Sequence, residues 1–187
     1  MKKIIALGAS SSSKSINNTL AIFAASKVAD ASINVIDLND YILPLYSVDS
    51  EEEFGIPEGA HKFNDIIESA DGLVISLAEH NGTYTAVFKN LIDWLSRIDM
   101  KVWKGKPMLL MATSPGSRGG ESVLEAAKSY FPFMEAAIVA DFSLPSFYDN
   151  FSNSGITNAV LASQLKEKIA LFEQSLEMVE TLNPSKN

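Results

Sequence analysis

The stretch Lys3–Leu20, K-I-I-A-L-G-A-S-S-S-S-K-S-I-N-N-T-L, decides how the chain begins to fold. Its apolar run, Ile4–Leu7, predicts a fully buried strand, which Gly8 ends in a loop of small hydroxylated residues. A helix pattern opens at about residues 15–17. A strand that leads through such a loop into a helix presents free backbone N–H groups and the positive end of the helix dipole at one place. The stretch therefore predicts an anion site, and phosphate is the commonest occupant of such sites.

The side chains of this loop suit an anion as well. Hydroxyl groups, one ammonium group and one amide can add donors to the main chain, from Ser10, Ser11, Ser12, Ser13, Ser15, Lys14 and Asn17. The whole chain has 15 Lys and Arg against 23 Asp and Glu, a net charge of −8, and these charges are dispersed. This composition argues against a nucleic-acid partner, which would require a basic stripe. A local nest of N–H groups can still outweigh a diffuse acidic surface.

Composition limits the remaining possibilities. A chain of 187 residues that is 47% hydrophobic predicts one globular domain over residues 1–187. It has no cysteine, which excludes disulfides and fits a reducing compartment, and its two histidines are too few for a histidine-rich metal centre. The apolar run after Lys2-Lys3 is too short for a signal peptide, and no run is long enough to span a membrane. We therefore expect a cytoplasmic protein without a metal or a membrane partner.

Strands and helices alternate along the chain. The predicted strands are 4–7, 32–38, 73–78, 108–113 and 136–141. The predicted helices run from about 16 to 30, 63 to 70, 87 to 98, 121 to 130 and 161 to 179. A loop at 39–57 and an aromatic loop at 142–151 interrupt this order, and only the last few polar residues stand apart from it.

This alternation predicts an α/β fold with right-handed crossovers. Five strands in this length favour a flavodoxin-like three-layer α/β/α sandwich, with a parallel sheet in the order 2-1-3-4-5. In that order the ligand crevice lies at the carboxyl ends of strands 1 and 3. Three loops of unusual composition, 8–15, 79–82 and 114–120, follow strands 1, 3 and 4. We therefore expect them to converge on one site.

Each loop also has a second interpretation. G-A-S-S-S-S-K-S at 8–15 matches the P-loop pattern G-x-x-x-x-G-K-[ST] except that Ser13 replaces the second glycine. A P-loop enzyme is therefore an alternative, and serines that only cap and connect are another. Glu79 and His80 could form an acid–base pair, but neighbouring side chains in an extended segment point to opposite faces. Asn81-Gly82 also suits a polar turn between a strand and a helix, and 114–120 suits a flexible connector.

The predicted helix at 87–98 carries charges at helical spacing, which indicates a solvated face for Lys89, Asp93 and Arg97. Trp94 is expected in the core or at a subunit interface. The hydrolase elbow G-x-S-x-G does not occur, and few side chains offer chemistry of their own. A bound cofactor should therefore supply the reaction.

Several motifs together resemble the NAD(P)H-dependent FMN reductase family, which includes chromate, quinone and azo-dye reductases. Residues 8–17 resemble its phosphate loop G-S-x-R-x-x-S-x-N. Lys14 stands in for the arginine of that pattern, and the loop is one residue longer. L-P-L-Y at 43–46 with Asp49 resembles its proline–tyrosine loop. A-E-H-N-G-T at 78–83, followed by F-K-N-L-I-D-W at 88–94, is similar to P-E-Y-N-x-S and L-K-N-A-I-D-W. G-K-P at 105–107 and the loop at 114–120 also match by position.

The resemblance implies FMN as cofactor and NADPH or NADH as electron donor. It implies that the FMN phosphate lies at Ser10, Ser11, Ser12, Ser13, Lys14, Ser15, Ile16 and Asn17. It implies that the isoalloxazine ring is bordered by Glu79, His80, Asn81, Gly82, Ser114, Pro115, Gly116, Arg118, Gly119 and Gly120. A homodimer or homotetramer is implied too, with each flavin near the partner subunit.

The expected reaction is a ping-pong transfer of hydride to flavin N5 and of electrons onward to a small acceptor such as a quinone or free flavin. The protein contributes orientation and electrostatics, and no side chain is assigned as catalytic. Arg118 is a candidate contact for the phosphates of the nucleotide. The alternative from another class is a flavodoxin-type electron carrier, which the acidic composition would suit.

Overall fold

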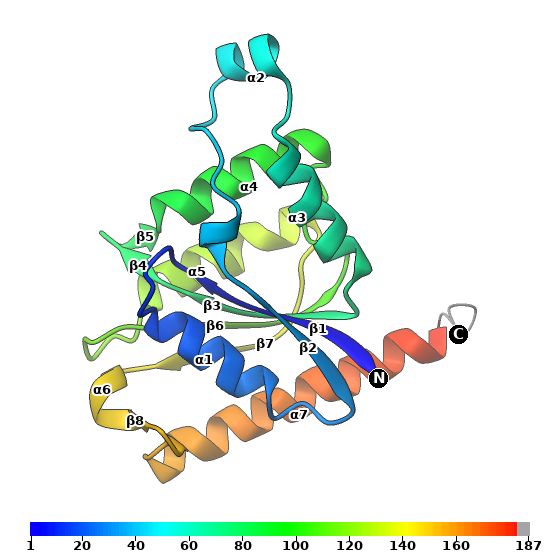
Figure 1. The fold of residues 1–187 in the computed structure, drawn as a ribbon. Coiled ribbons are helices and arrows are strands. Elements are labelled where there is room, and N and C mark those ends of the chain that lie inside the picture. The colour runs from blue at the N-terminus through cyan, green and yellow to red at the C-terminus, as the bar shows by residue number, and fades with distance from the viewer. Residues whose placement is uncertain (183–187) are drawn as a thin grey trace.

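In the computed structural model, which describes residues 1–182, one parallel sheet forms the centre of the molecule (Figure 1). Its order is β2-β1-β3-β6-β7, as predicted from the sequence. The strands are β1 (Lys2–Ala9), β2 (Ala31–Ile36), β3 (Gly72–Leu77), β6 (Pro107–Thr113) and β7 (Ala137–Leu144). The winding reverses between β1 and β3, which places the switch point where the sequence expects it.

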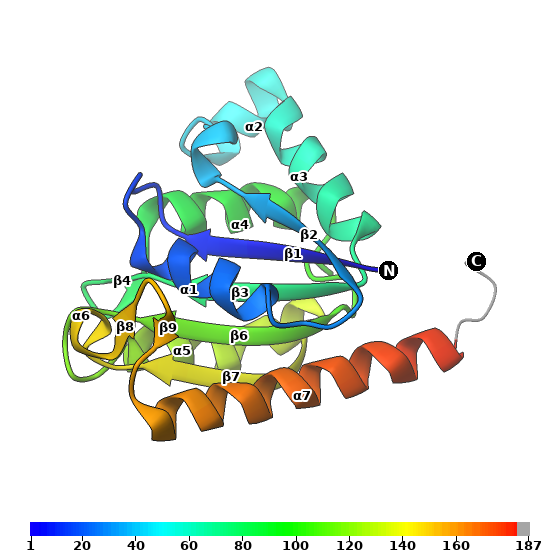
Figure 2. The same ribbon diagram turned by 60° about the horizontal axis from the view of Figure 1, so that its bottom comes forward.

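Helices cover both faces of the sheet (Figures 1 and 2). One face carries α1 (Ile16–Ala25) and the long α7 (Ala159–Leu182). The other carries α3 (Glu58–Ser69), α4 (Ala86–Ile98) and α5 (Glu121–Tyr130), followed by the short 3-10 turn η2 (Phe131–Met134). This arrangement is the three-layer sandwich that the alternating pattern predicts.

The sheet has a hydrophobic core on each of its faces, because the central strands are apolar on both sides. Every residue of β3 and of β6 is buried. Phe63, Leu91 and Trp103 belong to the core beneath α3–α5, and Leu20, Leu109 and Phe172 to the core beneath α1 and α7. Such burial on both faces is typical of parallel sheets. It fixes the strands that position the loops at their carboxyl ends.

The helix at the start of the chain needs close contact with β1. A side chain on Gly8 would overlap the backbone nitrogen of Asn18, so only glycine lets α1 begin this near the strand. Ser15 caps α1 and accepts a hydrogen bond from the Asn18 N–H at 3.1 Å. The strand, loop and helix of the opening stretch thus form one compact unit.

Some predicted boundaries need correction. The first helix ends at Ala25 and not near Asp30, because Lys27 and Val28 close it with tight turns. The segment 39–57 is not all loop: it contains the 3-10 turn η1 (Leu38–Asp40) and the helix α2 (Val48–Phe54). The last strand, β7, extends three residues further than predicted, to Leu144.

The remaining predicted loops also contain regular structure. The aromatic loop after β7 includes α6 (Phe147–Asn150) and a small hairpin of β8 (Phe151–Ser152) and β9 (Gly155–Ile156). The polar turn after β3 is a hairpin of β4 (Glu79–His80) and β5 (Thr83–Tyr84). Residues 183–187, most of the polar end of the sequence, lie outside the described residues.

Candidate functional site

Three strands end side by side at one edge of the sheet. Ala9 is the register partner of Leu77, and Leu77 is the partner of Ala112 near the end of β6. The segments that leave these strands, 10–15, 78–85 and 114–120, therefore begin as neighbours. The observed sheet order brings together the three loops that the sequence analysis singles out.

A buried amide joins the elements beneath these loops. The Asn17 side chain is 3% exposed, and its Oδ1 accepts from the Ser76 hydroxyl at 2.7 Å and from the Thr113 N–H at 3.0 Å. Its Nδ2 donates to the Thr113 carbonyl at 3.0 Å. The first turn of α1 is thereby fixed to β3 and β6. The side-chain amide is therefore engaged inside the fold. Only the main-chain N–H of Asn17 can contribute to the anion site, and that contribution stays a prediction.

The serine loop leaves backbone donors open. Its own turns use the N–H groups of Ser10, Ser12, Lys14 and Ser15, whose acceptors all lie within residues 8–12. In the described part of the chain, no acceptor binds the N–H groups of Ser11, Ser13, Ile16 and Asn17. Ser11–Lys14 are exposed. Open N–H groups beside a helix N-terminus are the donor set that a phosphate requires.

The second loop is a tight hairpin. Glu79 pairs with Tyr84 and His80 with Thr83, and Asn81 and Gly82 have φ values of 52° and 83°. Positive φ at both turn positions is typical of the type I′ turn that Asn-Gly favours. The predicted strand-to-helix turn is therefore a hairpin. His80 is exposed whereas Glu79 is turned inward, as alternation along a strand predicts.

A residue that the sequence analysis missed ties this hairpin to the first loop. Thr85 is 2% exposed, and its hydroxyl donates to the Ala9 carbonyl at 2.9 Å while accepting from the Phe88 N–H at 3.3 Å. It is the N-cap of α4. A threonine just before a helical pattern signals this cap, but the bond to Ala9 depends on the sheet topology.

The third loop is bound by the residues that follow β7. Ser146 N–H donates to the Gly116 carbonyl at 2.9 Å, and Phe147 N–H donates to the Ser114 carbonyl at 3.1 Å. Gly119 has φ 59°, and a side chain there would overlap Ser143 Oγ, which donates to the Gly119 carbonyl at 3.1 Å. These contacts are more than a flexible connector makes, and sequence reasoning did not foresee them.

Glu79 connects the second loop to the third. Its Oε2 accepts from the Val123 N–H in the first turn of α5 at 3.1 Å. Its Oε1 lies 3.5 Å from Arg118 Nη2, and the two side chains are 15% and 69% exposed. The predicted site residues Glu79 and Arg118 are therefore in contact, whereas Lys14 makes no ion pair among residues 1–182.

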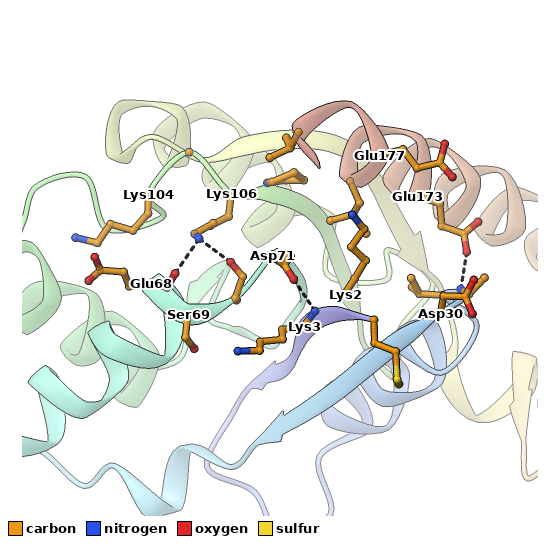
Figure 3. Close-up of a pocket in the computed structure, with 18 residues that line it drawn as sticks. Lys2, Lys3, Asp30, Glu68, Ser69, Asp71, Lys104, Lys106, Glu173 and Glu177 are labelled. Atoms are coloured by element: carbon orange, nitrogen blue, oxygen red, sulfur yellow. Dashed lines mark hydrogen bonds between the residues drawn. The ribbon is translucent and has the colours of Figure 1, made fainter. Parts of the chain in front are cut away.

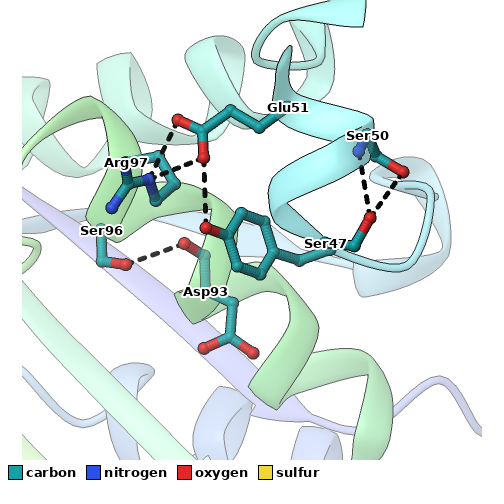
Figure 4. Close-up of polar contacts among 7 residues, drawn as sticks. Ser47, Ser50, Glu51, Asp93, Ser96 and Arg97 are labelled. Carbon is teal, nitrogen blue, oxygen red and sulfur yellow. Dashed lines mark hydrogen bonds and ion pairs between the residues drawn. The ribbon is translucent and has the colours of Figure 1, made fainter. Parts of the chain in front are cut away.

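The charged face of α4 carries the predicted solvated pair and one contact that was not predicted. Lys89 pairs with Asp93 at 2.6 Å in solvent, as expected, but Arg97 binds both oxygens of Glu51 in α2, at 2.9 and 3.0 Å (Figure 4). The buried Trp94 donates to the Pro44 carbonyl at 2.7 Å. These bonds hold the segment 38–57, here called the arm, against α4. Trp94 is buried in the core, which was one of the two predicted places for it, the other being a subunit interface.

A separate cleft of about 950 Å³ lies at the opposite edge of the sheet (Figure 3). Its polar groups bind one another: Lys106 Nζ donates to the Glu68 and Ala70 carbonyls at the end of α3, and Lys3 N–H donates to Asp71. A lysine on the last carbonyls of a helix is a common way to close it. We therefore interpret these polar groups as structural, because they join the end of α3 to the amino ends of β1 and β6.

Within residues 1–182, no group of three or more His, Asp or Glu side chains could hold a metal ion. No helix in the same range is long and apolar enough to cross a membrane.

Comparison with known proteins agrees with this geometry. A quinone reductase from Escherichia coli K12 is 34% identical over 114 residues, which are 60% of this chain and 61% of that protein. A 2-hydroxy-1,4-benzoquinone reductase from a Burkholderia species is 41% identical over 107 residues, 56% of each chain. The matches thus span about three fifths of the length of these relatives.

A solved structure shows the same fold over nearly the whole chain. The flavoenzyme NAD(P)H:acceptor oxidoreductase FerB from Paracoccus denitrificans superposes with a TM-score of 0.75 at 24% identity, covering 95% of this chain and 98% of its own. The sequence profile of the family described as NADPH-dependent FMN reductase matches residues 2–149, which include all three loops and the switch point between β1 and β3. The chain therefore belongs to the NADPH-dependent FMN reductase family.

Proposed function

We propose that this protein is an FMN-containing NAD(P)H-dependent reductase that acts on quinone-type acceptors. One observation carries the proposal: the three loops of unusual composition meet at the carboxyl edge of the sheet, at its topological switch point. Family membership and the quinone reductases among the relatives support the same activity.

The residues of the first loop fit the phosphate of FMN. Four main-chain N–H groups that have no acceptor among residues 1–182, those of Ser11, Ser13, Ile16 and Asn17, supply donors, and the exposed Lys14 supplies a charge. Ser10, Ser12 and Ser15 shape this loop through the turns described above. A dianion gains both from the donors and from the dipole of α1.

The other two loops are suited to border a flat ring. Asn81 and Gly82 form an exposed hairpin tip, and Gly116 is an exposed glycine of the third loop, whereas Gly119 and Gly120 are buried where that loop meets α5. We propose that Glu79, His80, Asn81 and Gly82 border the ring from the second loop. From the third loop we propose the remaining predicted residues, Ser114, Pro115, Gly116, Arg118, Gly119 and Gly120.

FMN held by these loops would supply the redox chemistry, namely hydride acceptance from NAD(P)H and two-electron reduction of the acceptor. In total, NAD(P)H and one proton reduce a quinone to its hydroquinone. The chain orients the two substrates and excludes water through fixed backbone groups. We assign no side chain as proton donor.

The test is an absorption spectrum of the purified protein with added FMN, followed by steady-state oxidation of NADPH and NADH with benzoquinone. We expect a bound-flavin spectrum and turnover that requires FMN. FMN binding without turnover would instead favour a flavodoxin-type electron carrier. A protein that stays colourless with FMN but binds ATP and magnesium would favour the P-loop alternative.

Three further features belong to the proposal. Residues 1–187 form one domain, which the five-stranded sheet with a core on each face supports. The protein is cytoplasmic, which its lack of cysteine supports. It assembles as a homodimer or homotetramer, and the exposed apolar side chains of the arm, Ile42, Leu45, Val48 and Phe54, offer a surface for a second copy.

A further inference from the structure

The predicted site contains very few charges. Within the three loops 10–17, 79–82 and 114–120, the only charged side chains are Lys14, Glu79 and Arg118. Lys14 lies in the serine loop, which leaves Arg118 as the one lysine or arginine within the sequences of the other two loops. A nicotinamide nucleotide is strongly anionic and must approach a protein with a net charge of −8. The partner of Arg118 therefore matters for nucleotide binding.

The two oxygens of Glu79 have unequal partners. Oε2 is bound by the Val123 N–H at 3.1 Å, inside the first turn of a helix ten residues long. This bond and the helix dipole both favour a carboxylate at that position. Because the side chain is only 15% exposed, the position of Glu79 is well defined.

The bond from Arg118 is the weaker of the two. Its Nη2 lies 3.5 Å from Oε1, which is longer than a charge-assisted hydrogen bond, and the side chain is 69% exposed. A guanidinium has five N–H donors, and this contact uses one edge of it. A long contact from an exposed arginine contributes little, and Arg118 can exchange it for a better partner such as a phosphate.

We propose that Glu79 is a positioning residue with two effects: it anchors the start of α5 to the hairpin, and it competes with the phosphates of the nicotinamide nucleotide for Arg118. The competition rests on the proposed function, since it requires that the nucleotide binds beside the third loop. Glu79 then weakens nucleotide binding and favours release of the oxidised product. The residue is not assigned any part in the transfer of hydride.

The test compares Glu79→Gln, Arg118→Gln and the double variant by calorimetric titration of the FMN-loaded proteins with NADP⁺. Glutamine keeps an oxygen for the Val123 N–H but removes the charge that faces Arg118. We expect Glu79→Gln to bind NADP⁺ about two- to five-fold more tightly, which is the range for losing an exposed ion pair. Arg118→Gln should bind it more weakly, and adding Glu79→Gln to that variant should then change nothing.

Glu125→Gln is the matched control, because it removes a carboxylate from α5 that pairs with Lys128 at 2.9 Å on its surface. Its dissociation constant should equal that of the unaltered protein. A structural role alone would not produce coupling to Arg118. The competition is refuted if Glu79→Gln, with an unchanged melting temperature, binds NADP⁺ equally or less tightly, or if its effect persists without Arg118.

The outcomes also separate this inference from the proposed function. If the unaltered protein binds FMN and NADP⁺ but the Glu79 variant behaves like it, only the competition is wrong. If the unaltered protein binds neither, the proposed function is wrong and the competition with it.

Discussion

At the scale of single residues, the most consequential side chain is one that no ligand needs to touch. Asn17 lies in the first turn of α1 and spans from there to β3 and β6 through three hydrogen bonds. Sequence reasoning placed its amide in the anion site, because an asparagine beside a serine loop has the right chemistry for one. Which way the side chain points depends on Ser76 and Thr113, which are distant in sequence.

Asn17→Ala should reduce the free energy of unfolding by about 2–4 kcal/mol, because it leaves buried groups of Ser76 and Thr113 without partners. Urea unfolding measures this. The neighbouring Asn18→Ala is the control, since Asn18 Oδ1 has no partner among the described residues and the alanine keeps the Cβ beside Gly8. Equal losses in the two variants would contradict the role given to Asn17.

Tyr84 shows the opposite situation, a buried hydroxyl without a partner within residues 1–182. Its ring stacks on Phe131, with centroids 6.0 Å apart. Burial raises the pKa of Tyr84 to about 12. Since this folded-state pKa exceeds the ordinary value of 10.0, the neutral phenol favours the folded state below pH 10, and that contribution is lost as the pH rises toward 12.

Tyr84→Phe should therefore increase the free energy of unfolding at pH 8 by about 1 kcal/mol, since it removes a polar group that burial leaves unpaired. It should also remove part of the loss of stability between pH 10 and pH 12. Chemical denaturation at pH 8 and pH 11 measures both. Tyr46→Phe, which loses a bond to Glu51, should instead destabilise the protein. A Tyr84→Phe variant that is less stable would mean that its hydroxyl has a partner after all.

At the scale of elements, sequence prediction succeeded where burial follows a regular period. The fourth predicted helix has the bounds of α5, Glu121–Tyr130, and the central strands were recognised from their apolar runs. It failed for α2, none of whose residues is buried. That helix has no apolar face to produce a pattern, and its Glu51 is held by Arg97 from an element far along the chain.

The same contrast applies to the loops of the site. Their convergence could be predicted because the topology of a parallel sheet determines which loops are neighbours. Their internal bonds could not, because Thr85 to Ala9 and Ser146 to Gly116 join residues that no local pattern relates.

For the serine loop we predict an effect on binding that depends only on the phosphate of FMN. Lys14→Ala should weaken FMN binding about two- to five-fold, as expected for an exposed charge, and leave riboflavin binding unchanged. Flavin fluorescence titrations measure both ligands. Lys166→Ala, an exposed lysine on α7, is the control and should affect neither. An equal loss for FMN and riboflavin would place the phosphate away from this loop.

At the scale of the whole molecule, the arm extends from the sandwich beside α4 (Figure 1). Its side chains Ile42, Leu45 and Phe54 are 86%, 82% and 77% exposed. Trp94 and Asn90 nevertheless bind its Pro44 carbonyl, and Arg97 binds its Glu51 carboxylate. A segment with exposed apolar side chains on a fixed main chain suits an interface between copies, because little conformational freedom is lost on binding.

Leu45→Glu should accordingly shift the protein from dimers or tetramers toward monomers in sedimentation equilibrium, because association would bury an unpaired charge. Val160→Glu, at a site 66% exposed on α7, should leave the assembly unchanged. A monomeric unaltered protein, or a Leu45→Glu variant that assembles normally, would rule out the arm as the interface.

The central claim is that the carboxyl edge of the sheet holds FMN through the serine loop and the two loops beside it. A crystal structure of the protein with FMN tests this most directly. We predict the phosphate within hydrogen-bond distance of the N–H groups of Ser11, Ser13, Ile16 and Asn17, and the ring in contact with residues 79–82 and 114–120. A flavin bound at the opposite cleft, near Lys106 and Glu173, or a phosphate away from the serine loop, would contradict the claim.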